Sequence, residues 1–389
     1  MNCWKKRFII CIFSLCACFN TVAIGASSQD NDIQKLHVIE NNILASERLF
    51  GFIDQDGRII CPPMFYHAWE FHNGLARVQP TSSEKYGFID TTGAYVVLPE
   101  LADAADFSEG LAAVKSEANG LYGYINTDGE IVIPPKYSRA FKFINGRGRV
   151  NIDGVTAYID KSGNELMRTP YLKIWDTEGD MISFFSGRNL GFMNQDGKVI
   201  VEPKYFPVIY WANLMFTEPI TPVGLEKKYG FIDKTGKVVV DFQYDWVYQF
   251  KEGLATVSKD DQYGFIDTSG KVIIPLQFEE AWYFSENLAA VKVNNRWGFI
   301  NKQGRMVIQP QFLTPRFGGP IYFHEGLAAV RTENGSGYIN KQGDMVIAPV
   351  YTYAGEFSGG VAEVRFRSIC YINRQGEYLW PPNPKPFNG

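Results

Sequence analysis

The chain has 389 residues, of which 46% are hydrophobic, 15% aromatic and 21% charged, which excludes a disordered chain and supports buried cores. The formal net charge is −4, from 38 basic and 42 acidic side chains, and no cluster of Lys or Arg interrupts the repeats described below. This charge pattern argues against a nucleic-acid-binding protein.

Residues 1–25 are typical of an export signal. Three basic residues at 5–7 precede an apolar stretch, at about 8–19, that is too short to cross a bilayer as a stable helix. Cleavage would release a chain beginning near residue 26; alternatively, the motif ending in Cys18 resembles a lipobox, and lipidation there would anchor the protein. No later segment is long and apolar enough to span a membrane, so we expect a periplasmic, secreted or cell-surface protein.

Between residues 50 and 380 the chain repeats one unit about ten times, at intervals of 33 to 39 residues. Each unit contains an aromatic-Gly-Phe-Ile-Asp motif or a close variant, in which we call the glycine the anchor position. A second glycine follows the anchor by six residues, at Gly57, Gly93, Gly129, Gly163, Gly197, Gly236, Gly270, Gly304, Gly343 and Gly376. In each unit an Asp or Asn stands three residues before this glycine. This spacing predicts a hairpin turn in which the glycine adopts a positive φ.

Two further strands are predicted in each unit. A β-branched run such as 271–274 follows the turn, and we expect the next proline, here Pro275, to end strand pairing because it has no N–H to donate. About ten looser residues later, a second motif ending in Gly-Leu-Ala-x-Val, as at 250–257, predicts a short strand. We call its first residue the repeat Phe. Each unit therefore reads as a three-stranded antiparallel meander.

The two recurring motifs resemble those of the WG-repeat, or KWG-repeat, proteins of bacteria. Residues 296–301 carry the Trp-Gly pair, and residues 85–90 and 228–233 carry its Tyr variant. The resemblance covers roughly residues 50–380. It implies an interaction module in an exported or surface protein, with no catalytic residues shared across the family.

The expected fold is all-β, with about ten three-stranded units stacked as an open solenoid or superhelix. A closed propeller-like ring is the alternative, disfavoured because blades normally need four strands and ten blades would be many. Residues 26–49 are expected to form a tail and a cap strand, and residues 381–389 a C-terminal tail. An insertion at 314–320 lies either on a binding face or at a tolerant surface position.

Two cysteines, Cys61 and Cys370, lie in the first and last units. A disulfide between them would require the array to close on itself, because their Cα atoms must come within about 7 Å. The other interpretation is two buried free thiols that act as small apolar residues.

Aromatic residues near the repeat Phe are the candidate ligand contacts. Trp69 and Trp282 stand two residues before it, Tyr248 takes the same place in another unit, and Trp246 is close by. Their rings either pack in the core or offer faces to sugar rings or to side chains of a partner protein.

The sequence carries no signature of a catalytic, cofactor or metal site. The histidines have no metal-type spacing, and the glycines and Asp or Asn residues recur at fixed turn positions, which gives them a structural reason. We therefore predict a non-catalytic scaffold, not an enzyme, that binds another protein in the periplasm or at the cell surface. Binding of cell-wall or other glycans through the candidate aromatics is the alternative.

Overall fold

The structure is a computed structural model. It describes residues 36–42, 48–80, 83–175, 181–208, 219–316, 318–366 and 369–381. The expected export signal with Cys18, and the tail beyond residue 381, lie outside these ranges. Within them the chain forms strands, turns and loops, and contains no helix that could cross a membrane.

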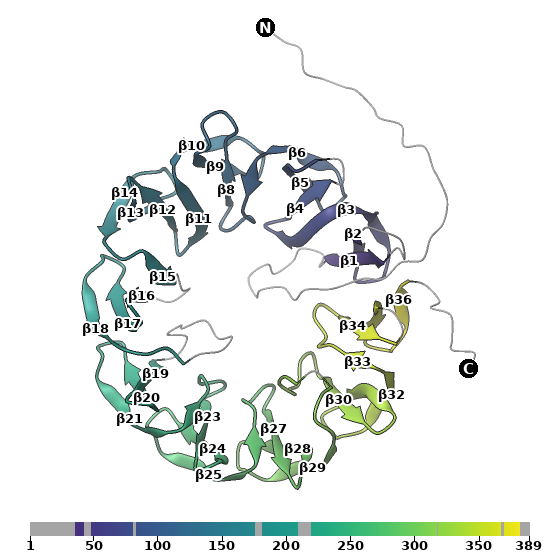
Figure 1. The fold of residues 1–389 in the computed structure, drawn as a ribbon. Coiled ribbons are helices and arrows are strands. Elements are labelled where there is room, and N and C mark those ends of the chain that lie inside the picture. Colours follow the sequence, from purple (N-terminus) through teal and green to yellow (C-terminus); the bar gives the residue numbers. More distant parts are fainter. Residues whose placement is uncertain are drawn as a thin grey trace.

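The described strands form nine antiparallel sheets (Figure 1). The first has six strands, in the order β1 (Leu36–Asn42), β2 (Arg48–Asp54), β3 (Ile59–His72), β4 (Leu75–Pro80), β5 (Tyr86–Asp90) and β6 (Tyr95–Leu101). Two sheets have three strands, namely β19 (Ile220–Leu225), β20 (Lys228–Asp233) and β21 (Val238–Tyr244), and β30 (Ala328–Thr332), β31 (Gly335–Ile339) and β32 (Met345–Tyr351).

The remaining six sheets have four strands each. The first three are β7 (Asp103–Ala104), β8 (Leu111–Lys115), β9 (Tyr122–Asn126) and β10 (Ile131–Tyr137); β11 (Arg139–Ile144), β12 (Arg147–Ile152), β13 (Val155–Ile159) and β14 (Glu165–Thr169); and β15 (Lys173–Trp175), β16 (Met181–Ser186), β17 (Asn189–Asn194) and β18 (Val199–Tyr205). The last three are β22 (Trp246–Val247), β23 (Leu254–Lys259), β24 (Gln262–Asp267) and β25 (Val272–Phe278); β26 (Glu280–Ala281), β27 (Leu288–Val293), β28 (Arg296–Asn301) and β29 (Met306–Phe312); and β33 (Tyr353–Ala354), β34 (Val361–Arg365), β35 (Ile369–Asn373) and β36 (Tyr378–Trp380).

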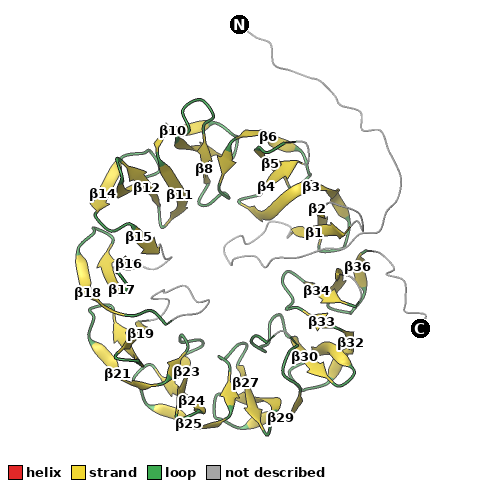
Figure 2. Cartoon of the chain, in the orientation of Figure 1, coloured by secondary structure: helices red, strands yellow, loops and turns green. Residues whose placement is uncertain are grey.

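The sheets are the blades of a closed propeller ring, so the prediction of an open solenoid is wrong (Figure 1, Figure 2). The prediction counted three strands per unit, but most units contribute a fourth. The stretch expected to be loose contains the two-residue strands β7, β22, β26 and β33, which extend the meander toward the inside of the ring. With this strand the unit has the four antiparallel strands of a propeller blade.

The ring closes by side-chain packing between its first and last sheets. Ile39 and Ile53 of the first sheet form one buried cluster with Val361, Tyr371 and Trp380 of the last. We call this contact the seam. In the described strands no hydrogen-bonded pair joins the two sheets, because β1 pairs with β2 and β36 pairs with β35.

Ten repeat units give nine sheets because β3 serves two units. Its first half pairs with β2, where Cys61 is opposite Phe52, and its second half pairs with β4, where Ala68 is opposite Val78. The first two units therefore share one long strand and one six-stranded sheet.

The repeated turns have the geometry of a tight hairpin. The ten turn glycines have φ between +75° and +90°. In one of these turns, Gly270 N donates to Asp267 O at 2.9 Å, while Asp267 Oδ1 accepts from Ser269 N at 2.9 Å and Lys271 N at 3.1 Å. The aspartate side chain thus satisfies the turn backbone, and the glycine supplies the left-handed conformation.

The anchor glycine is explained by the outermost strand of the blade. A Cβ on Gly264 would lie 2.7 Å from Ile274 O and 2.8 Å from Leu276 Cα, because β25 bulges across it. Pro275 lies within this strand and does not end it: pairing shifts register and resumes at Phe278. The expectation that proline ends strand pairing is therefore wrong, because an outermost strand has a free edge and a bulge tolerates the missing N–H.

In the two units whose anchor position is not glycine, the described outermost strand does not bulge across the anchor position. In the fourth unit β13 pairs directly with β14 through Ala157, which is opposite Arg168. In the last unit the described pairing of β36 stops at Trp380, opposite Tyr371, so it does not reach Cys370. A side chain at the anchor position is accommodated where the outer strand does not cross it.

A repeated aromatic pair packs neighbouring units together. The aromatic residue after the anchor lies 4.8 to 5.0 Å, between ring centroids, from the repeat Phe that comes next in the chain. The pairs are Phe52 with Phe71, Phe88 with Phe107, Tyr124 with Phe143, Phe231 with Phe250, Phe265 with Phe284, Phe299 with Phe323, and Tyr338 with Phe357. The core is accordingly divided into a series of clusters between units.

Cys61 and Cys370 are buried and no disulfide joins them, which confirms the second interpretation although the ring closes. Cys61 packs with residues of the second unit, including Ile89, and Cys370 packs with Tyr338 of the preceding blade. Each thiol thus lies in a cluster that does not include the seam. Burial, with the nearby Asp90 charge adding to it, raises the pKa of the Cys61 thiol to about 11.

Candidate functional site

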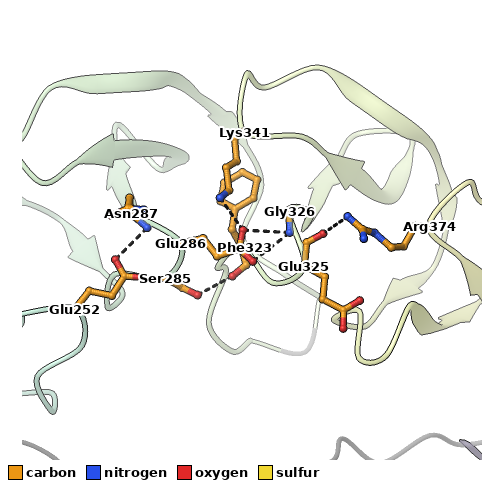
Figure 3. Close-up of polar contacts among 9 residues, drawn as sticks. All are labelled: Glu252, Ser285, Glu286, Asn287, Phe323, Glu325, Gly326, Lys341 and Arg374. Carbon is orange, nitrogen blue, oxygen red and sulfur yellow. Dashed lines mark hydrogen bonds and ion pairs between the residues drawn. The ribbon is translucent and has the colours of Figure 1, made fainter. Parts of the chain in front are cut away.

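Glutamates that stand two residues after the repeat Phe join neighbouring blades (Figure 3). Glu286 accepts from Gly326 N of the next blade at 3.1 Å and pairs with Lys341 Nζ of that blade at 2.8 Å. Similar contacts link Glu252 to Asn287 N and Lys302. These groups therefore have structural roles.

We call this arrangement the glutamate clasp. Its acidic members are Glu109, Glu252, Glu286 and Glu325, and its basic partners are Lys161, Lys302, Lys341 and Arg374. The four glutamates have φ between +51° and +54°, a conformation that non-glycine residues rarely adopt. This backbone geometry directs each carboxylate toward the next blade.

Trp69 is covered by a cation. The Arg77 guanidinium lies 3.8 Å from the centroid of its ring, and the Tyr86 ring is 5.7 Å away. The half-buried indole thus packs inside its own sheet.

The other three candidate aromatics come together in one row that spans three sheets. Tyr229 lies 5.5 Å from Trp246, Trp246 lies 6.1 Å from Tyr248, and Tyr248 lies 5.5 Å from Trp282. Trp282 in turn stacks at 6.5 Å on the buried ring of Trp297, and its indole N–H is buried without a hydrogen-bond partner among the described residues. These rings therefore contact one another both within and between blades.

The position two residues before the repeat Phe contributes to the lining of both spaces between the blades. It holds a large ring at Trp69, Phe141, Tyr248 and Trp282, an isoleucine at Ile321, and a small residue at Ala105 and at Gly355. Each cavity is lined by two such positions, Ala105 with Phe141 and Gly355 with Ile321. A cavity opens at each of these two small residues. The sequence contained this signal, because the position is in register with the repeat Phe.

The first cavity, which we call the basic cavity, has a volume of about 500 Å³. It is lined by Arg77, Tyr122, residues 103–106 and residues 139–142. Arg77 Nε lies 3.0 Å from Asp106 Oδ1, and Tyr122 OH donates to Asp103 Oδ2 at 2.6 Å. Burial, together with this hydrogen bond to Asp103, raises the pKa of Tyr122 to about 12, so the phenol stays protonated as a donor.

The second cavity, which we call the loop cavity, has a volume of about 300 Å³ and is lined in part by the insertion at 314–320. Arg331 Nη1 donates to Thr314 O at 3.1 Å and holds the start of the loop. Tyr322 OH donates to Glu356, and burial followed by this hydrogen bond raises the pKa of Tyr322 well above its usual value. Phe317 of the insertion lies outside the described residues.

The two cavities occupy equivalent places in the repeat. Ala140 and Ala354 are paired in the same way with the valine of the next strand, Val150 and Val364. In each case the stretch that begins one residue before this alanine lines the cavity, namely residues 139–142 for the basic cavity and 353–356 for the loop cavity. The cavities therefore open on the same side of the ring, between different pairs of blades. Elsewhere, the described residues contain no group of three His, Cys, Asp or Glu side chains placed to hold a metal ion.

A family model described as "WG containing repeat" matches the chain at residues 50–79, 86–119, 122–155, 191–205, 229–263, 263–297, 297–312 and 337–367. Together these stretches make up more than half of the chain. No curated protein matches it.

Solved structures give likenesses at low sequence identity. The crystal structure of the eukaryotic initiation factor is 12% identical with a TM-score of 0.50, over 90% of this chain and 95% of that chain. PorZ of Porphyromonas gingivalis is 12% identical with a TM-score of 0.30, over 93% and 59%. AztD of Citrobacter koseri is 10% identical with a TM-score of 0.32, over 79% and 92%. At such identities the first likeness concerns the fold alone.

Proposed function

Because the chain belongs to the WG containing repeat family, we propose that it is a non-catalytic scaffold that binds another protein in the periplasm or at the cell surface. The observation that carries this proposal is the pair of equivalent inter-blade cavities at Ala105 and Gly355. A rigid ring with openings at chosen positions of a repeat offers separate contact points to a large partner. The export signal expected at residues 1–25 supports the location.

Protein binding is favoured over glycan binding by the surroundings of the candidate aromatics. Sugar stacking needs an accessible ring face, but Arg77 covers one face of Trp69 and Trp282 packs on Trp297. The cavities instead combine backbone, charged groups and small apolar residues, which is the mixture that side chains of a partner protein fill.

Site-specific photo-crosslinking in cells tests the proposal. A photoreactive amino acid at Lys142, on the basic cavity, should give a discrete heavier species that contains a second envelope protein. The same probe at Lys237, beside a turn that lines neither cavity, is the matched control. Absence of any crosslinked protein from Lys142 and from Tyr353, or retention of the purified protein on envelope glycans alone, would count against protein binding.

A further inference from the structure

The basic cavity lies beside an unusually basic segment of the chain. Lys136, Arg139, Lys142, Arg147 and Arg149 fall within 14 residues, and no Asp or Glu occurs between Glu130 and Asp153. The chain as a whole has more acidic than basic side chains, 42 against 38. These cations are not contiguous in the sequence, because they are spread over three strands, β10, β11 and β12.

The acidic groups inside the cavity are already engaged. Asp106 pairs with Arg77 at 3.0 Å and Asp103 accepts from Tyr122 at 2.6 Å. Both contacts lie within the cavity lining, so they neutralise or occupy its own carboxylates. The charge that remains for a ligand is therefore positive.

Two cations at the cavity, Arg139 and Lys142, are exposed and make no ion pair with another described residue. Beside them lies Phe141, which carries the Arg149 guanidinium at 3.7 Å from its ring centroid. Ala105 and Ala140 leave apolar space next to these charges. A carboxylate on a short apolar stem fits such a site, since Arg and Lys can pair with the acid group while the stem covers the alanines.

We propose that the basic cavity binds an acidic peptide segment of the partner protein, with a Glu or Asp carboxylate paired to Arg139 and Lys142. This proposal rests on the proposed function and names the chemistry of the partner. A peptide is favoured over an anionic polysaccharide because the apolar space beside Ala105 and Ala140 suits the short apolar stem of a Glu or Asp side chain.

Selection from a random library of dodecapeptides displayed on phage, with the purified protein as the immobilised target, tests the proposal. Selected peptides should be enriched in Asp and Glu. Replacing their acidic residues by Asn and Gln should weaken binding, measured by fluorescence polarisation, by roughly tenfold or more. The double variant Arg139→Gln/Lys142→Gln should cause a loss of the same size.

Two further variants make the result specific. Lys136→Gln removes a cation of the same segment that does not line the cavity, and binding should change by less than about twofold. Ala105→Trp places the ring of other units in the cavity and should abolish binding while the protein stays folded. Since Arg139 and Lys142 are exposed, their variants keep the test valid if Ala105→Trp does not fold.

Three outcomes would overturn the proposal: no peptide is selected, the selected peptides lack acidic residues, or Lys136→Gln weakens binding as much as the double variant. Binding of a polyuronate but of no acidic peptide would point to an anionic glycan instead. If the double variant still gives the crosslinked partner from Tyr353, the acidic-peptide proposal fails and the scaffold function stands. If no position gives a partner, the proposed function itself fails.

Discussion

The blades from β22 to β36 and the seam between the last and first sheets are held together in different ways. Each pair of neighbouring blades in the first group has a glutamate clasp. Glu252 and Glu286 pair with a lysine of the next blade, whereas the Glu325 carboxylate accepts from Gly359 N and Gly360 N and its backbone carbonyl accepts from Arg374. At the seam the matching positions are Gly359 and Gln55, so neither partner of the clasp is present. The contact described at the seam is instead the apolar cluster around Tyr371.

The residue at the position of the clasp glutamate and the residue at the position of its basic partner vary together along the chain. Where the turn carries Asn73, its side chain still accepts from Gly110 N of the next blade at 3.0 Å, but the position matching the clasp lysine is Thr127. Glutamate is used where a cation faces it, and an uncharged side chain is used where none does. The clasp is therefore a paired feature of neighbouring units, and the seam lacks it.

The largest effect is expected from truncating the apolar packing of the seam. Tyr371 is fully buried there, and Tyr371→Ala should lower the free energy of unfolding by about 3–5 kcal/mol. It should also open the ring, seen as a larger radius of gyration by small-angle X-ray scattering. Tyr338→Ala, beside the clasped contact of Glu325, should cost similar stability without opening. Equal expansion of both variants would contradict the comparison.

The next effect concerns the anchor position in a clasped blade and in the seam blade. Gly264→Ala should cost about 1–3 kcal/mol, because its Cβ meets the backbone of β25. Cys370→Ala, at the same position of the last blade, should cost about 1 kcal/mol or less, because it removes only one buried atom. Urea denaturation measures both, and equal losses would show that the outer-strand bulge does not dictate the glycine.

Removal of one clasp should have a smaller effect. Glu286→Ala should cost about 1–2 kcal/mol, because Gly326 N loses its acceptor and Lys341 its partner. Glu286→Gly should cost less than Glu286→Ala, since glycine relieves the positive φ of +51° at this position. Thermal or urea unfolding gives the order, and a larger loss in the glycine variant would refute the role of backbone conformation.

The clasp should weaken in acid. Burial alone would raise the pKa of Glu286, but hydrogen bonds from Lys341 and Gly326 N outweigh it and leave the pKa below its ordinary value of 4.5. A lowered pKa in the folded state means that the carboxylate stabilises the fold above about pH 4.5, and that this contribution is lost as the pH falls through the folded-state pKa. The stability difference between the wild type and Glu286→Gln should therefore be present at pH 7 and shrink below about pH 4. A constant difference would refute the ionic contribution.

The smallest effect is expected from building a clasp across the seam. Gly359 has φ +59°, close to the values of the four clasp glutamates, so Gly359→Glu places a glutamate in the same backbone conformation, with the cost that a non-glycine residue has there. Relative to Gly359→Glu alone, the addition of Gln55→Lys should raise the stability by about 0.5 kcal/mol, as exposed ion pairs do. The single variant Gln55→Lys is the control and should have no effect. A double variant no more stable than Gly359→Glu would show that the seam geometry differs from that of the other blades.

The sequence predicted the parts of the fold that depend on neighbouring residues. The turn around Gly270 and the strands on either side follow from local backbone chemistry, and the resemblance to the WG-repeat family rests on motifs within single units. The closed ring was not predicted, because it depends on two-residue strands such as β26, which are too short to show a period in sequence.

The candidate site could be predicted only in part, for a related reason. The clasp joins Glu252 to Lys302, which are 50 residues apart, and no local pattern connects them. Likewise Ala105 and Gly355 can be aligned in the sequence on the repeat Phe, but the presence of a cavity beside each depends on how the blades pack. The sequence pointed to the large aromatic side chains as candidate contacts, whereas the two cavities lie beside the small residues Ala105 and Gly355.

The prolines within the outermost strands affect how one ring meets another. These strands expose apolar side chains, such as Ile131 at 63% and Val272 at 45%, along an edge that no further strand covers. Such an edge would ordinarily recruit a strand from a second molecule and seed aggregation. Pro134 and Pro275 each remove a donor from this edge and accompany a change of register, so two molecules that touch at their circumferences cannot extend a common sheet.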